Sequence, residues 1–293
     1  MVKIDLHMHG PIGYHPYWLR SQGYKGKNLL QLHTDICLER RIDLCAITSE
    51  DFHIPKLIPS CPADRFGCLA SYAESLPEDY EPEVGENIIS VKKGQRKVKF
   101  LNAQAVIVKE NGKRFTHVVI GSNQVPNGED FEHTIDYASR RGLIQLLGNV
   151  GLESHFGVGL KRAQELLKEF GDQIHAIEGY DAQMILPRRL SRLPKIGQYS
   201  MEANDLAQKF AEDNDMCWIA ISNAHWIESA GMSNIISNER LDESSERALF
   251  TDIGKVLKLG KFENETKPES YRALLSWLLR FQWGIRGKKY KRE

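Results

Sequence analysis

The chain has 293 residues, 41% hydrophobic and 27% charged, a balance typical of a globular protein that folds in water. Lysine plus arginine and aspartate plus glutamate number 39 each, and this zero net charge argues against a protein that binds nucleic acid with its whole surface. No apolar stretch approaches the roughly 20 residues of a membrane span, and five scattered cysteines form no disulfide framework. We therefore expect a cytoplasmic protein without a membrane segment.

Strand-like apolar runs alternate with helical patterns along the chain. The strands are predicted at residues 2–6, 42–48, 100–108, 114–120, 143–147, 173–180 and 216–222, and the helices at 27–40, 131–141, 159–170, 200–213, 243–258 and 267–281. Asn111-Gly112 lies between two strand runs and predicts a hairpin turn. Residues 52–97 are rich in charge and contain several prolines, so we expect an irregular surface insertion there.

Repeated strand–helix units imply parallel strands with helical crossovers. With roughly six or seven strands, a closed α/β barrel is favoured over an open sheet. We expect a barrel domain over residues 1–265, and a C-terminal helix and basic tail over 266–293 that pack on it. Part of that segment is alternatively a contact with a second copy of the chain. The basic run at 286–292 is more typical of a solvated terminus than of a phosphate-binding arm.

Two histidines, His7 and His9, follow the first apolar run. Residues i and i+2 of a strand point to the same side, so both imidazoles can converge on one metal ion. Other polar residues that follow predicted strands are Glu50, Gln104, Gln124, Asn149, Glu178, Asn223 and His225. In parallel α/β folds such residues gather at the carboxyl end of the sheet, where active sites lie.

These segments together resemble the polymerase and histidinol phosphatase (PHP) family of metal-dependent phosphoesterases. Asp5-Leu6-His7-Met8-His9 is similar to the first motif, and the later motifs are matched by residues 46–51, 119–124, 147–150 and 222–225. The order and spacing cover about residues 1–230. The resemblance implies a distorted (β/α)7 barrel with up to three metal ions at the strand ends.

The resemblance also implies a reduced metal centre. The matching ligands are His7, His9, His15 and His225, whereas Glu50 stands where histidine is usual, Gln104 where a bridging glutamate is usual, Gln124 and Asn149 where histidines are usual, and Asn223 where aspartate is usual. The amide trio Gln104, Gln124 and Asn149 is expected to bind no metal. The set of His7, His9, Gln104 and Asn223 is expected to bind one weakly or not at all. His15, Glu50 and His225 remain a competent set for one Zn²⁺, Mn²⁺ or Fe²⁺ ion.

Some of these residues could have a structural role instead of binding a metal. Glu50 is alternatively a helix cap or a salt-bridge partner, and His15 an ordinary loop histidine. A shift in register would place Asp51 or His53 in the site instead of Glu50. Glu178 faces either the barrel mouth or a neighbouring helix.

The resulting hypothesis is a PHP-like phosphoesterase with a mononuclear site in which His7, His9 and Glu50 are catalytic. Its substrate is expected to be a small phosphorylated molecule or nucleotide, contacted by Gln104, Gln124, Asn149, Glu178 and Arg188. The main alternative is an inactive family member that binds a ligand or a partner protein. Association with nucleic acid through the basic tail is the weakest hypothesis.

Overall fold

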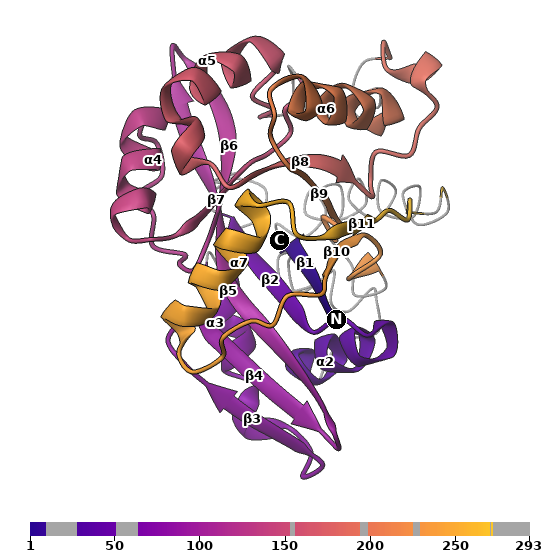
Figure 1. The fold of residues 1–293 in the computed structure, drawn as a ribbon. Helices are drawn as coiled ribbons and strands as arrows, with labels where there is room; N and C mark the ends of the chain where they lie inside the picture. Colours follow the sequence, from indigo (N-terminus) through magenta and orange to yellow (C-terminus); the bar gives the residue numbers. More distant parts are fainter. Residues whose placement is uncertain are drawn as a thin grey trace, which may run out of the picture.

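One strongly curved sheet with helices on its outside forms the protein (Figure 1). The computed structural model describes residues 1–9, 28–50, 64–152, 156–193, 199–224, 229–269 and 271. In this part the strands are β1 (Val2–Met8), β2 (Leu44–Glu50), β3 (Tyr80–Val84), β4 (Ile88–Lys93), β5 (Arg96–Glu110), β6 (Lys113–Ile120), β7 (Ile144–Leu147), β8 (Ala176–Asp181), β9 (Trp218–Ile221), β10 (Asn234–Ser237) and β11 (Glu263–Glu265). The α-helices are α2 (Leu29–Arg40), α3 (Arg65–Ala70), α4 (Phe131–Arg140), α5 (Leu160–Phe170), α6 (Met201–Asp213) and α7 (Glu246–Lys258).

The wall of the barrel consists of the strands in the order β1-β2-β5-β6-β7-β8-β9. Neighbouring strands are parallel from β1 to β5 and again from β7 to β9, whereas β6 is antiparallel to both of its neighbours. The reversal follows from the predicted hairpin turn, in which Asn111 (φ 48°) and Gly112 (φ 76°) both adopt the left-handed conformation. The predicted distorted (β/α) barrel is confirmed, with β6 as its one reversed wall strand.

Backbone and side-chain hydrogen bonds both close the barrel between β9 and β1. At the carboxyl ends, the His9 amide donates to the Ala224 carbonyl (3.0 Å) and the Asn223 amide to the His7 carbonyl (2.9 Å). Lower down, the side chain of Asn264 in β11 accepts a hydrogen bond from the Ala220 amide (2.7 Å) and donates one to the Trp218 carbonyl (2.9 Å). Because β11 pairs with β10 and β10 with β1, one side-chain amide joins the two edges.

Helix α7 covers the end of the barrel opposite to the carboxyl ends of the parallel strands. Its apolar residues Leu249, Phe250, Ile253, Val256 and Leu257 recur with helical spacing and belong to the same buried cluster as the inward residues of the wall. The Ser245 side chain caps the helix by accepting from the Ala248 amide (3.1 Å). With this end filled by apolar side chains, polar groups can reach the barrel axis only at the other end.

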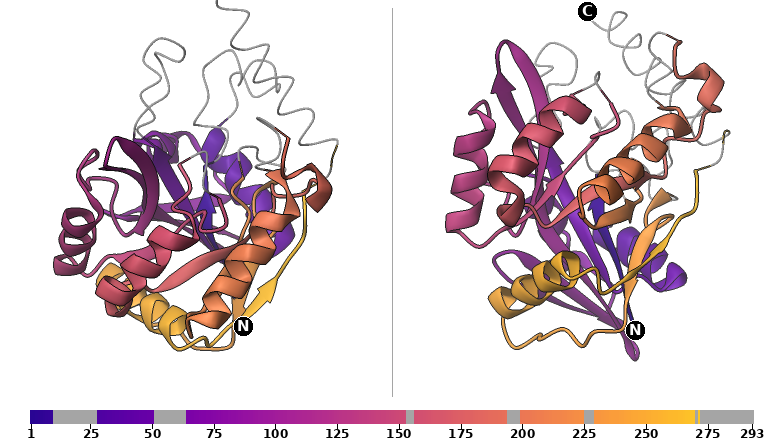
Figure 2. Two further views of the ribbon diagram at one scale, coloured as in Figure 1. Left: turned by 90° about the horizontal axis from the view of Figure 1, so that it is seen from above. Right: turned by 45° about the horizontal axis from the view of Figure 1, so that its top comes forward.

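The remaining helices cover the outer faces of the wall (Figure 2). Helices α2 and α3 pack on β1, β2, β4 and β5 in one buried cluster, and α4, α5 and α6 pack on β5 to β9 in another. No helix in the described residues is long and apolar enough to cross a membrane.

The expected irregular insertion at 52–97 is wrong for its described part. Residues 64–97 contain α3, the strands β3 and β4, and the start of β5. The three strands pair antiparallel in a ribbon that continues the barrel wall. The charged, exposed residues of β3 obscured this pattern because one edge of the ribbon faces solvent. The sequence analysis also missed β10 and β11. Of the helix predicted at 267–281, residues 267–269 are not helical, and nearly all the rest lie outside the described residues.

Replacing Asn264 tests the side-chain closure of the barrel. Asn264→Ala removes both hydrogen bonds to β9 and is expected to lower the free energy of unfolding by about 1–3 kcal/mol. Urea denaturation measures the loss. Glu263→Ala, at an exposed position of the same strand, is the control and is expected to change stability far less. Equal losses in both variants would contradict the closing role of Asn264.

Buried His33 gives the protein a predictable sensitivity to acid. Burial in the apolar cluster lowers the pKa of His33 to about 4, against 6.5 for an exposed histidine. A lowered pKa in the folded state contributes stability above pH 6.5 that is lost as the pH falls toward 4. His33→Leu is expected to reduce the pH dependence of the unfolding free energy near pH 5 by about 1 kcal/mol per pH unit. Substitution of His133, whose side chain is 71% exposed, should leave that slope unchanged.

Candidate functional site

A β-bulge in β1 aims His7 and His9 into the barrel. Asp5 pairs with Cys45 and Met8 with Ile47, so Leu6 and His7 together oppose one residue of β2. Leu6 therefore stays in the inner core, Met8 turns to the outer cluster under α2, and His7 turns inward beside Leu6. The extra residue converts the regular alternation of the strand into a pair of inward imidazoles at its carboxyl end.

A second bulge, in β8, turns the carboxylates of Glu178 and Asp181 toward the inside of the barrel. Glu178 pairs with Ile219 and Tyr180 with Ala220, which leaves Gly179 as the extra residue. Because of it, Glu178 and Asp181 both point inward although they are three residues apart. A side chain at Gly179 would place its Cβ 2.6 Å from the Cβ of Trp218, so only glycine fits without movement.

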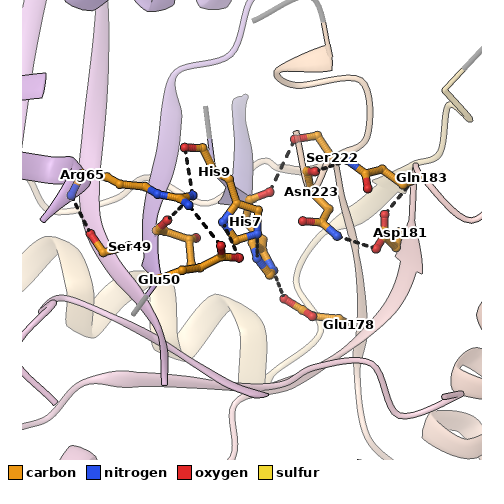
Figure 3. Close-up of polar contacts among 11 residues, drawn as sticks. His7, His9, Ser49, Glu50, Arg65, Glu178, Asp181, Gln183, Ser222 and Asn223 are labelled. Atoms are coloured by element: carbon orange, nitrogen blue, oxygen red, sulfur yellow. Dashed lines mark hydrogen bonds and ion pairs between the residues drawn. The ribbon is translucent and has the colours of Figure 1, made fainter. Parts of the chain in front are cut away.

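The two histidines form the centre of the cluster (Figure 3). Their Nε2 atoms face each other at 2.9 Å, and the rings meet edge to face with centroids 4.7 Å apart. The Nδ1 atom of His7 lies 2.6 Å from Glu178, and that of His9 lies 3.0 Å from Glu50. Each imidazole is thus held from behind by a buried carboxylate, and Glu178 belongs to the mouth rather than to a helix contact.

Glu50 is also joined to Arg65, a residue that the sequence analysis did not single out. Arg65 is 1% exposed; its guanidinium contacts the Glu50 carboxylate (3.0 Å) and donates to the carbonyls of His9 and Thr48 (3.2 Å each). Its backbone amide donates to the Ser49 hydroxyl (3.1 Å). Nothing in the local sequence marks this arginine, because its burial depends on how α3 packs against β2.

Asn223 completes the group from the closing edge. Its φ of 46° is left-handed, and its Nδ2 donates to Asp181 (2.8 Å). The backbone carbonyl of Asn223 accepts a hydrogen bond from the side chain of Gln183 (2.6 Å). The backbone amide of Gln183 in turn donates to Asp181 (2.8 Å). The Oδ1 atom of Asn223 is buried and has no hydrogen-bond partner in the described residues. Asp181 directly follows the predicted strand 173–180, but strict alternation from Glu178 would have turned it outward.

The electrostatics show an excess of negative charge around His7. Burial alone lowers the pKa of His7, but the nearby carboxylates, Glu178 foremost, outweigh it and raise that pKa. Burial lowers the pKa of His9 to about 4, with Glu50 opposing the effect. Burial raises the pKa of Asp181 to about 7 against the hydrogen bonds that it accepts.

Gln104 points away from this cluster. Its side-chain amide donates to the Val125 carbonyl and accepts from the Val125 amide, at 2.8 Å each, on the outer face of β5. The inward positions beside it are Ala103 and Ala105. Gln104 therefore fastens a neighbouring segment to the wall in this structure.

Among the other predicted substrate contacts, Glu178 contacts His7, whereas Gln124, Asn149 and Arg188 have different surroundings. Gln124 is exposed, and Asn149 is half-buried in a left-handed turn (φ 53°). Arg188 is exposed and paired with Asp205 of α6. His15 and His225, as well as Asp51 and His53, lie outside the described residues, so the proposed His15–Glu50–His225 set stays a prediction.

The described residues offer a partial metal site. Nitrogen atoms about 2.05 Å from one shared ion lie about 2.9 Å apart at a right angle and about 3.3 Å apart at the tetrahedral angle. The two Nε2 atoms are 2.9 Å apart, the distance of a hydrogen bond between the rings and also that of two ligands at a right angle. The unpartnered Asn223 Oδ1 is a third possible donor in the described residues. No group of three or more histidine, cysteine, aspartate or glutamate side chains in the described part is arranged to hold an ion. The neutral donors fit a cation, and the carboxylates surround them.

Comparisons with known proteins agree with the fold. PsfC from Pseudomonas syringae PB-5123 matches with a TM-score of 0.58 and 13% identity, over 96% of this chain and 98% of that one. A two-domain protein from Bacteroides vulgatus ATCC 8482, which contains a predicted PHP-like metal-dependent phosphoesterase, matches with a TM-score of 0.53 and 13% identity, over 91% of this chain and 65% of that one. No family model and no curated protein matches the sequence. At these identities the likeness is one of fold.

Gly179→Ala tests the bulge in β8. The added methyl group would overlap Trp218, so we expect a loss of about 1–3 kcal/mol in unfolding free energy. Gly171→Ala, where the new Cβ meets nothing within 4 Å, is the matched control and should be neutral or slightly stabilising. Denaturant unfolding of both variants measures the difference. A Gly179 variant as stable as the control would contradict the tight bulge.

Proposed function

We propose that the protein is a PHP-like metal-dependent phosphoesterase with one divalent ion per chain at the barrel mouth. One observation carries the proposal: the Nε2 atoms of His7 and His9 converge at the carboxyl end of the barrel, each ring backed by a carboxylate. The fold shared with a PHP-like protein supports it.

The donors in the described residues are His7 and His9 through Nε2 and Asn223 through Oδ1, with His15 and His225 as proposed further ligands. Zn²⁺, Mn²⁺ and Fe²⁺ all accept imidazole nitrogen. When bound, the ion would polarise a phosphoryl oxygen and lower the pKa of a water molecule. Glu50 contacts His9 and Arg65, so we assign it the support of His9 instead of direct ligation.

A second candidate, a binding protein without turnover, is favoured by a specific observation. The position matched to the bridging glutamate is Gln104, whose side-chain amide bonds the backbone of Val125. The inward residues on either side of it are Ala103 and Ala105. No anionic ligand therefore reaches the mouth from β5. Such a protein would keep the cation without hydrolysing an ester.

Metal content and hydrolysis, measured on the same protein, test the proposal. Protein purified without chelators is expected to hold about one divalent ion per chain and to hydrolyse at least one member of a panel of phosphomonoesters and nucleotides. His7→Ala and His9→Ala should each abolish both, while His133→Ala, at an exposed helix position, should change neither. Bound metal without hydrolysis would favour the binding protein. Hydrolysis that survives both histidine substitutions would sink the proposed site.

A further inference from the structure

Each inward donor in the described mouth is held by its own carboxylate. His7 is paired with Glu178 (2.6 Å), His9 with Glu50 (3.0 Å) and Asn223 with Asp181 (2.8 Å). In all three pairs the carboxylate contacts the nitrogen that points away from the centre. The three acids come from β2 and β8, whereas the three donors come from the end of β1 and the segment after β9.

This pairing fixes which donor atom each side chain presents. A carboxylate only accepts, so the hydrogen bond to Glu178 places a hydrogen on the Nδ1 of His7, and the 3.0 Å contact with Glu50 favours the same tautomer for His9. The Nε2 of each neutral ring then presents a lone pair. The same argument orients Asn223, because its Nδ2 donates to Asp181 and its Oδ1 is left without a hydrogen-bond partner in the described residues. Two lone pairs facing each other at 2.9 Å would repel; a proton on one Nε2 turns the contact into a hydrogen bond between the rings, and a metal ion that both nitrogens bind takes the place of that proton.

We propose that Glu178, Glu50 and Asp181 are positioning residues that orient three neutral donors toward one divalent cation and supply its balancing charge from behind. The proposal rests on the proposed function, because it concerns the same cation. In this arrangement each carboxylate contacts the side chain that presents the donor atom and is not itself a ligand. Carboxylate–histidine–metal pairs of this kind fix the ring and raise the basicity of its donor nitrogen.

The charges of the group agree with this role. In the described residues three acids, Glu178, Glu50 and Asp181, lie around the donors against the single guanidinium of Arg65, so this part of the mouth is rich in acidic groups. All four side chains are largely buried, so little water screens them. The sequence resemblance assigned this half of the centre no anion, because it compared ligand positions only. Glu178 and Asp181 supply negative charge without occupying those positions.

The test is the affinity of the full-length protein for Zn²⁺ alone, measured by competition with a chelating dye. Glu178→Ala and Asp181→Ala are each expected to weaken binding by about 10–100-fold. Glu178→Gln keeps an acceptor for Nδ1 and should recover part of the loss. Glu239→Gln, a surface carboxylate paired with Lys261, is the matched control and should change nothing. Circular dichroism and thermal unfolding verify that each variant is folded; if an alanine variant does not fold, the isosteric Gln and Asn variants decide.

A second measurement separates positioning from direct ligation. In ¹⁵N spectra of histidine-labelled protein, His7 is expected as the Nδ1–H tautomer with Nε2 bound to the metal, and Glu178→Ala should mix its tautomers. A loss of more than about 1,000-fold without recovery in Glu178→Gln would show a direct ligand and overturn the inference. Affinities within threefold of the control would overturn it too, while leaving the phosphoesterase proposal intact. The expected losses without any hydrolysis would support the inference and reject the phosphoesterase.

Discussion

The polar mouth depends on one extra residue in each of two wall strands. Side chains alternate across a strand with a period of two, so a regular β1 would place Leu6 and His7 on opposite faces. His7 and His9 would then point into the apolar layer under α2. The bulges in β1 and β8 shift the alternation once each, and both shifts occur only near the carboxyl ends. Below them the wall keeps its apolar interior.

The burial of the three carboxylates determines which partners they need. A buried ionised carboxylate is costly unless it has a partner, and each of the three carboxylates, Glu178, Glu50 and Asp181, has one. Their partners are His7, the pair His9 and Arg65, and the amide of Asn223. The neighbouring carboxylates, Glu178 foremost, raise the pKa of His7 against the effect of burial, whereas burial itself raises the pKa of Asp181.

One end of the barrel contributes to the apolar core, and the other end carries the polar site. At one end α7 adds five apolar side chains to the inner core. At the other, the closing edge between β1 and β9 is made by the same residues that carry the site, since the amides of His9 and Asn223 form the bridging hydrogen bonds. The site is therefore built into the seam of the barrel, where a change in closure would move the donors.

The sequence by itself determined the strand–helix alternation, the hairpin at Asn111-Gly112, the barrel class and the H-x-H pair, because these depend on local periodicity and turn chemistry. It did not reveal the ribbon of β3 and β4, whose exposed edge lacks an apolar signal. Only the tertiary structure decided that Asp181 and Arg65 belong to the site and that Gln104 faces outward. Those outcomes depend on bulges and on packing between strands and helices far apart in the chain. One inserted residue reverses the face of every side chain that follows it, and no local pattern records where the insertion falls.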